Sequence, residues 1–207
     1  MRIVKAQLAL SILAVLALTL GGADGARADN LLVNSDFESG DLTGWVVAGQ
    51  SASSNVTVLP GDNGPACPGS NRAFMDSQAE AMGLTLKQTT ENGTAIGGAT
   101  LYSFDLKLDQ ADNGGVLFVE IFAEQEGVGI IGGTGLMGPF WPWGQWTTYN
   151  GSFEAPANTN FFTIQIMANT GANIGSNCLA HVDNVVLDQG TVANESLTWS
   201  GVKTLYR

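Results

Sequence analysis

Runs of alternating apolar and polar residues follow one another along most of this chain. In the run 101–108, every second residue from Tyr102 to Leu108 is apolar. Because successive side chains of a β-strand point to opposite faces, we expect this set to face a core and the intervening residues, Asp105 among them, to face water. No segment after residue 28 shows a sustained apolar repeat of 3.6 residues, so strands are predicted rather than helices.

Ten short strands are predicted, separated by segments rich in Gly, Asn, Asp and Pro. They are expected near residues 31–33, 45–47, 55–59, 72–76, 84–89, 101–108, 116–123, 146–153, 161–167 and 179–187. So many short strands are typical of a β-sandwich rather than of one open sheet. The predicted fold class is therefore all-β, with two antiparallel sheets.

Two of these strands have an unusual second face. In 116–123 and 161–167 one alternating set is aliphatic and suits a core, yet the other set mixes aromatic, amide and acidic side chains. The residues of interest on that second face are Phe118, Glu120, Phe122, Phe161 and Gln165. The pattern does not decide whether the two strands share a sheet, and burial of the aromatic rings under another layer is the alternative interpretation.

Three tryptophans lie close together after the glycine-rich segment 127–138. Pro142 and Gly144 interrupt strand pairing there, so we expect some of these indoles to be exposed. Trp141 and Trp143 are predicted to contact a ligand or a partner. Trp146, at the start of the next strand, is expected in the core.

The first 28 residues have the form of a signal peptide. Arg2 and Lys5 precede an apolar run over 6–20, and Ala26-Arg27-Ala28 has the small-x-small form of a cleavage site. The apolar run is shorter than the ~20 residues that a membrane span needs, and no later run approaches that length. We expect cleavage before Asp29 and export, as in bacterial secreted or cell-surface proteins, with a retained anchor as the alternative.

The rest of the chain is expected to hold one domain, 29–189, followed by a linker and tail, 190–207. The tail is either a frayed terminus or an element that docks on cell-surface or secretion machinery. The chain has 8 basic and 19 acidic residues and a net charge of −11. That charge argues against nucleic acid and anionic membranes, and it favours cations or neutral ligands.

Cys67 and Cys178 are the only cysteines. In an exported protein we expect them to form one disulfide, and two separate free thiols are the alternative. Their spacing does not fit a redox C-x-x-C site.

The segment Asn34–Trp45 is dense in turn residues and acids, with Phe37 and Trp45 as apolar anchors. It resembles the Asn-x-x-Phe-Glu-x-Gly-x-x-x-Gly-Trp opening of carbohydrate-binding modules of the family 4/9/22 type. Near the other end, Val182-Asp183-Asn184-Val185 resembles the closing strand of the same group. The resemblance covers residues 30–188 and implies a galactose-binding-like jelly roll.

The resemblance also implies a structural calcium ion that joins the two ends of the domain. Glu38 and Asp183 would supply carboxylates, and the loop before Phe74 would supply backbone carbonyls. Six to eight oxygen ligands suit Ca²⁺. A hydrogen-bonded corner without metal, in which both carboxylates accept backbone N–H groups, is the alternative.

The function favoured by these residues is binding of a polysaccharide or surface glycan without catalysis. Sugars present C–H faces to aromatic rings and hydroxyls to amides and acids, which matches the mixed strand face and the tryptophans. A structural or adhesive surface protein using the same sandwich is the alternative. No catalytic residue is predicted, because the single histidine, His181, has no recognisable nucleophile segment to serve.

Overall fold

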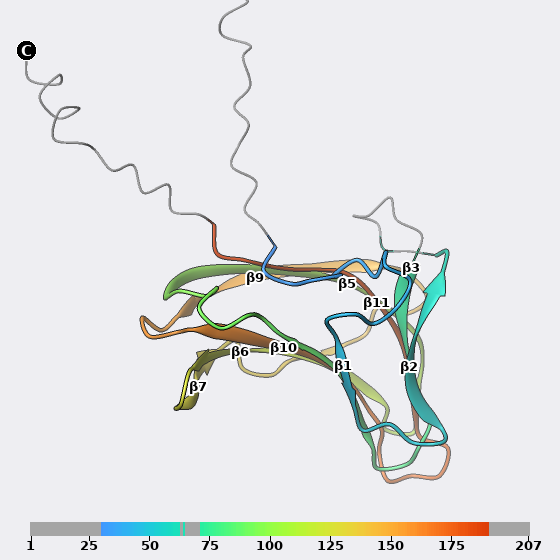
Figure 1. Cartoon of the computed structure of the whole chain (residues 1–207). Coiled ribbons are helices and arrows are strands. Elements are labelled where there is room, and N and C mark those ends of the chain that lie inside the picture. Colours follow the sequence, from blue (N-terminus) through green and yellow to red (C-terminus); the bar gives the residue numbers. More distant parts are fainter. Residues whose placement is uncertain (1–29, 63, 65–70, 191–207) are drawn as a thin grey trace, which may run out of the picture. The chain divides into compact units, whose positions relative to one another are not determined.

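The computed structural model describes residues 30–62, 64 and 71–190, and within them all regular structure is β (Figure 1). The strands are β1 (Val46–Ala48), β2 (Ser54–Pro60), β3 (Asn71–Ser77), β4 (Gly83–Thr89), β5 (Gly98–Asp112), β6 (Val116–Gln125), β7 (Gly129–Gly133), β8 (Met137–Phe140), β9 (Thr147–Ala155), β10 (Phe161–Asn169) and β11 (Asn177–Asp188). This part of the chain contains no helix long and apolar enough to cross a membrane. The predicted signal peptide, Cys67 and tail residues 191–207 lie outside the described residues.

The strands form two antiparallel sheets, which lie as two layers in Figure 1. Sheet A has the order β1-β4-β10-β6-β7, with β8 also paired to β6, and sheet B has the order β2-β3-β11-β5-β9. The chain passes repeatedly from one sheet to the other. Both sheets contribute buried apolar side chains to the core, so each sheet covers the apolar face of the other. The predicted jelly-roll sandwich is therefore confirmed.

The core lies between the layers and follows the alternation along the strands. Leu117, Val119 and Ile121 of β6 are fully buried, as are Ile164 and Ile166 of β10. Each such aliphatic side chain contributes about 1.5–3 kcal/mol when it leaves water. This burial fixes the register, because a slip by one residue would turn every core side chain outward.

The segment 31–33 was predicted to be a strand and is not one. Leu31 N–H donates to the carbonyl of Leu187 at 2.8 Å. Both backbone groups of Val33 are bonded to the side-chain amide of Gln88, at 2.6 and 2.8 Å. A buried side chain thus takes the place of a neighbouring strand.

Two strands in the glycine-rich segment, β7 and β8, were not predicted. Gly133 has φ of +145°, and a Cβ there would lie 2.1 Å from the carbonyl oxygen of Ile121. Glycine therefore allows β7 to approach β6, although glycine ordinarily argues against strand.

The corner 34–45 ties the start of the domain to its last strand. Phe37 is fully buried, and its ring centroid lies 5.5 Å from that of Trp45, whose indole N–H donates to the Asn34 carbonyl at 3.0 Å. Ser35 accepts a hydrogen bond from Val185 N–H of β11 at 2.9 Å. The prediction that Phe37 and Trp45 pin this corner to the core is confirmed.

Candidate functional site

Strands β6 and β10 are neighbours in sheet A, and this places the mixed set predicted from sequence on one surface. Gln165 is directly opposite Glu120, and its Nε2 lies 3.4 Å from the Glu120 Oε2. Phe122 is opposite Thr163, and Phe161 is opposite Glu124. We define the β6–β10 face as the outward residues Phe118, Glu120, Phe122, Phe161, Thr163, Gln165 and Met167.

All side chains of the β6–β10 face are half-buried, whereas the alternate residues of the same strands are fully buried in the core. Neighbouring side chains of an open sheet shield one another to about this degree. The rings of Phe118, Phe122 and Phe161 therefore belong to an accessible surface and not to the core, in contrast to the alternative interpretation of the sequence.

Strand β4 extends this face with residues that were not singled out from sequence. Leu84 and Leu86 point into the core, so Thr85, Lys87 and Thr89 point outward. Lys87 is opposite Gln165, and the hydroxyl of Thr89 lies 2.8 Å from that of Thr163. The alternation of residues 84–89 carried this signal, but the pairing of β4 with β10 could not be read from it.

Trp141 and Trp143 form an ordered, exposed aromatic pair on the loop between β8 and β9. Their rings stack at 5.9 Å with an angle of 14°, and 45% and 51% of the two residues are exposed. Leu108 of β5 holds the loop, donating to the Pro142 carbonyl and accepting from Gly144 N–H, both at 2.9 Å. The pair is thus anchored to sheet B, at the side of the sandwich where β8 and β9 are connected.

Trp146 is not in the core, contrary to expectation. It is half-buried, and its indole N–H donates to the Asp62 carbonyl at 2.9 Å. Its ring lies 6.1 Å from that of His181, which faces outward on β11 in sheet B. An indole N–H needs a hydrogen-bond acceptor, and the loop carbonyl provides one outside the core.

His181 is buried between charged partners. Its Nδ1 accepts from Arg72 Nε at 3.0 Å, and its Nε2 lies 2.8 Å from Asp109 Oδ2. Burial lowers the pKa of His181, and Asp109 acts in the opposite direction. Both ring nitrogens are occupied by structural partners, an arrangement that leaves the imidazole no free nitrogen for general-base chemistry.

The two carboxylates predicted to bind calcium accept backbone hydrogen bonds, Glu38 from the start of β3 and Asp183 from the loop between β2 and β3. Glu38 Oε1 accepts from Asn71 N–H at 2.8 Å. Asp183 Oδ2 accepts from Gly64 N–H at 2.8 Å, and its Oδ1 accepts from Asn184 N–H. These bonds are the ones expected for the corner without metal, and the same hard oxygens suit Ca²⁺.

Asp183 lies opposite Asp105 on neighbouring strands, and both are fully buried. Burial raises the pKa of Asp183 to about 6, and the nearby Asp105 and Asp36 add to this effect. The expectation that Asp105 faces water was wrong, because Asn184 and Thr148 donate to its carboxylate under the loop containing Gly64. The described residues include no group of three or more His, Cys, Asp or Glu side chains arranged to hold a metal.

Cys178 is fully buried, and its Sγ lies 3.6 Å from the Val116 carbonyl. Burial raises the pKa of its thiol to about 12. Because Cys67 is outside the described residues, the disulfide stays a prediction.

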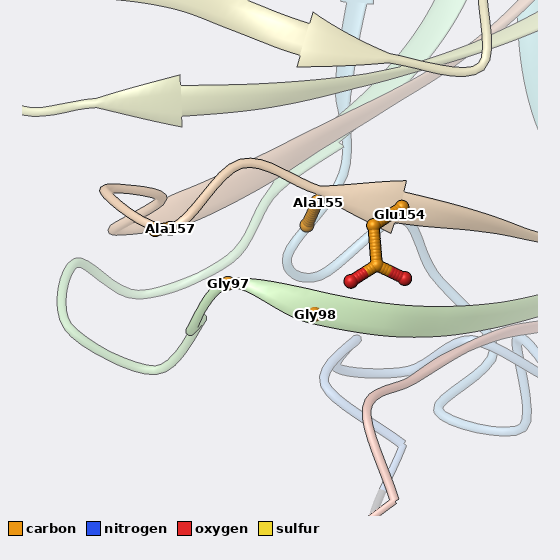
Figure 2. A pocket seen from close by; sticks show the side chains of 5 residues that line it. All are labelled: Gly97, Gly98, Glu154, Ala155 and Ala157. Carbon is orange, nitrogen blue, oxygen red and sulfur yellow. The ribbon is translucent and has the colours of Figure 1, made fainter.

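A shallow pocket of about 350 Å³ lies where β5 begins and β9 ends. Figure 2 shows the Glu154 carboxylate pointing from β9 toward Gly98 of β5, with Gly97, Ala155 and Ala157 around it. None of the residues predicted from sequence lines this pocket, so the candidate site remains the β6–β10 face.

No known protein family and no curated protein matches the sequence. Solved structures do match in fold. The xylan-binding CBM22-1 domain of Paenibacillus barcinonensis Xyn10C aligns with a TM-score of 0.53 and 14% identity, over 80% of this chain and 97% of that domain. TmCBM61, solved in complex with β-1,4-galactotriose, aligns with a TM-score of 0.52 and 16% identity, over 78% of this chain and 99% of that one.

The chain shares the jelly-roll fold of these carbohydrate-binding modules. The chain also aligns with the enzymatically active domain of tailspike protein 4 from bacteriophage CBA120, with a TM-score of 0.57 and 15% identity. That match covers 77% of this chain but spans only 21% of the tailspike chain. At these identities the comparisons establish the architecture, and the choice of ligand has to be argued from the residues.

Proposed function

We propose that this protein binds a polysaccharide or surface glycan through the β6–β10 face, without catalysis. The observation that carries the proposal is the pairing of β6 with β10, which gathers three phenylalanines around Gln165 and Glu120 on one accessible surface. Neighbouring structures with this fold include a xylan-binding domain and a galactotriose complex, which supports a glycan as the ligand.

The chemistry of the face suits a sugar chain. Phe118 and Phe122 are four residues apart on β6, about 13 Å along the strand, so their rings can contact different sugar units. Between them, Glu120 and Gln165 offer an acceptor and an amide to hydroxyl groups. Trp141 and Trp143 are a second proposed contact, since an exposed, preorganised aromatic pair loses little entropy when a ring stacks on it.

Affinity electrophoresis in gels containing xylan, galactan and other soluble polysaccharides tests the proposal. We expect at least one polysaccharide to retard the protein, and Phe118→Ala or Phe161→Ala to weaken binding by roughly tenfold, as expected for losing one aromatic contact. Phe74→Ala is the matched control, because Phe74 is a half-buried phenylalanine on the outward face of sheet B, stacked on His181.

A Trp141→Ala/Trp143→Ala double variant tests the tryptophan pair in the same gels. Weaker retardation would support the pair as a contact. If no polysaccharide retards the wild type or any of the variants, glycan binding would be refuted and a structural role for the sandwich favoured.

We further propose export through the predicted signal peptide and a structural Ca²⁺ held by Glu38 and Asp183. The support for the ion is the chemistry of the donors: a buried Asp183 beside a second buried carboxylate, Asp105, is stabilised by a cation. The ion would fasten the corner 34–45 and β11 to the loop between β2 and β3. It has no assigned role in contacting the glycan.

A further inference from the structure

The described part of the chain contains three Lys and Arg residues, and the side chains of two of them are bound to polar partners. Arg72 donates to His181 at 3.0 Å and to the Pro60 carbonyl at 2.9 Å. Lys107 lies 2.5 Å from Asp62 and 3.4 Å from Asp109. Both serve the network on the outward face of sheet B.

Lys87 is the exception among the described bases. Its side chain makes no hydrogen bond and no ion pair to any described residue. It projects from β4 onto the surface formed with β10, opposite Gln165 on one side and Val46 of β1 on the other. Lys87 is half-buried as a residue, and its ammonium group brings three N–H donors to the border of the β6–β10 face.

The charges across this surface are ordered. Lys87, Gln165 and Glu120 are in register on three neighbouring strands. With strands about 4.8 Å apart, the backbones of Lys87 and Glu120 are about 10 Å from each other. A side group that extends across the strands from a sugar chain lying along β6 therefore meets a carboxylate first, then an amide, then the cation.

We propose that Lys87 is a specificity-determining residue that pairs with the carboxylate of a uronic acid in the bound glycan. The inference rests on the proposed function and deepens it. One unpaired cation suits one carboxylate, and the acids Glu120 and Glu124 on the same sheet disfavour a densely charged polymer. The ligand is thus a largely neutral chain that carries an isolated uronic acid.

The net charge of −11 does not oppose this assignment. Charges further away than about 8 Å are largely screened at physiological ionic strength, whereas a direct ammonium–carboxylate contact is much less affected. The sequence-based preference for cations or neutral ligands describes the whole surface, and Lys87 is a local departure from it.

Calorimetric titration with a matched pair of ligands tests the proposal. One ligand is a xylo-oligosaccharide bearing a single glucuronic acid, and the other is the same oligosaccharide after reduction of that carboxylate to a primary alcohol. We expect the wild-type protein to bind the acidic form about tenfold more tightly, as for a hydrogen bond to a charged group. Lys87→Gln should bind both forms equally, and Lys87→Arg should keep the preference.

The result can separate the two proposals. Equal binding of both ligands by the wild type, or a preference that survives Lys87→Gln, would overturn the role of Lys87 and leave glycan binding intact. A preference for a sulfated oligosaccharide over the uronic acid would overturn it as well. Absence of binding to either form, and to every polysaccharide in the gels, would instead refute the proposed function.

Discussion

At the scale of single residues, His181 gives the most direct check of the geometry. It is the only histidine in the chain, so its NMR signals need no assignment by mutation. Because Arg72 donates to Nδ1, the proton of the neutral ring resides on Nε2, facing Asp109. We expect an NMR titration to show this tautomer and a pKa below 6.5.

The direction of this shift fixes how stability depends on pH. Since the folded-state pKa lies below the unfolded value, the unfolded chain binds more protons between the two values. The contribution of His181 to folding is therefore complete above pH 6.5 and falls as the pH drops through that window. An Nδ1–H tautomer, or a pKa of 6.5 or above, would contradict the arrangement with Arg72.

Residue alternation predicted the outward set on β6 and β10, because that property depends only on the strand itself. It failed for Asp105, whose burial depends on Asn184, Thr148 and the loop containing Gly64, all remote in sequence. Lys87 could not be recognised from sequence, since the lack of a partner for its side chain is visible only when its neighbours on β1 and β10 are known.

At the scale of the elements, strand β7 depends on glycine. A Cβ at Gly133 would lie 2.1 Å from the carbonyl oxygen of Ile121, and its φ is +145°. We expect Gly133→Ala to lower the free energy of unfolding by about 2 kcal/mol, through overpacking and backbone strain. Urea denaturation would measure this value.

Gly135→Ala is the control for β7, because Gly135 also has a positive φ, +68°, but no atom lies near its missing Cβ. It should cost about 1 kcal/mol, the conformational term alone. Equal effects of the two substitutions would show that β7 does not approach β6 as closely as described.

Nine of the ten expected segments coincide with strands. They could be predicted because each is a short β-like run with turn residues at both ends. The exceptions share one cause, which is that pairing depends on partners elsewhere in the chain. The segment 31–33 is held by the side chain of Gln88 instead of a strand. Strand β8 pairs with β6 although its sequence is Met-Gly-Pro-Phe.

At the scale of the whole molecule, calcium and protons should compete for the carboxylate of Asp183, and each should stabilise the folded state when it binds there. Without metal, its folded-state pKa of about 6 exceeds the ordinary value of 3.8, so the folded state binds more protons and stability falls as pH rises between these values. Calcium binding needs the ionised carboxylate. The gain in Tm on adding Ca²⁺ should therefore grow as pH rises through 6.

Melting curves with Ca²⁺ and with EDTA, at pH 5 and pH 7.5, measure both effects. Asp183→Ala should remove the sensitivity to chelator, while Asp76→Ala, which changes a half-buried acid on β3 away from the corner, should keep it. Equal melting with and without chelator at pH 7.5 would rule out the ion and leave the hydrogen-bonded corner.

The fold, the mixed strand face and the corner joining the two ends of the domain all agree with a glycan-binding sandwich. The decisive measurement is NMR mapping with a polysaccharide fragment that retards the protein, such as a xylo-oligosaccharide or β-1,4-galactotriose. We predict that the largest shifts fall on the β6–β10 face, at Phe118, Glu120 and Gln165, and on Lys87. Shifts confined to the outward face of sheet B, around Phe74 and His181, would contradict the account.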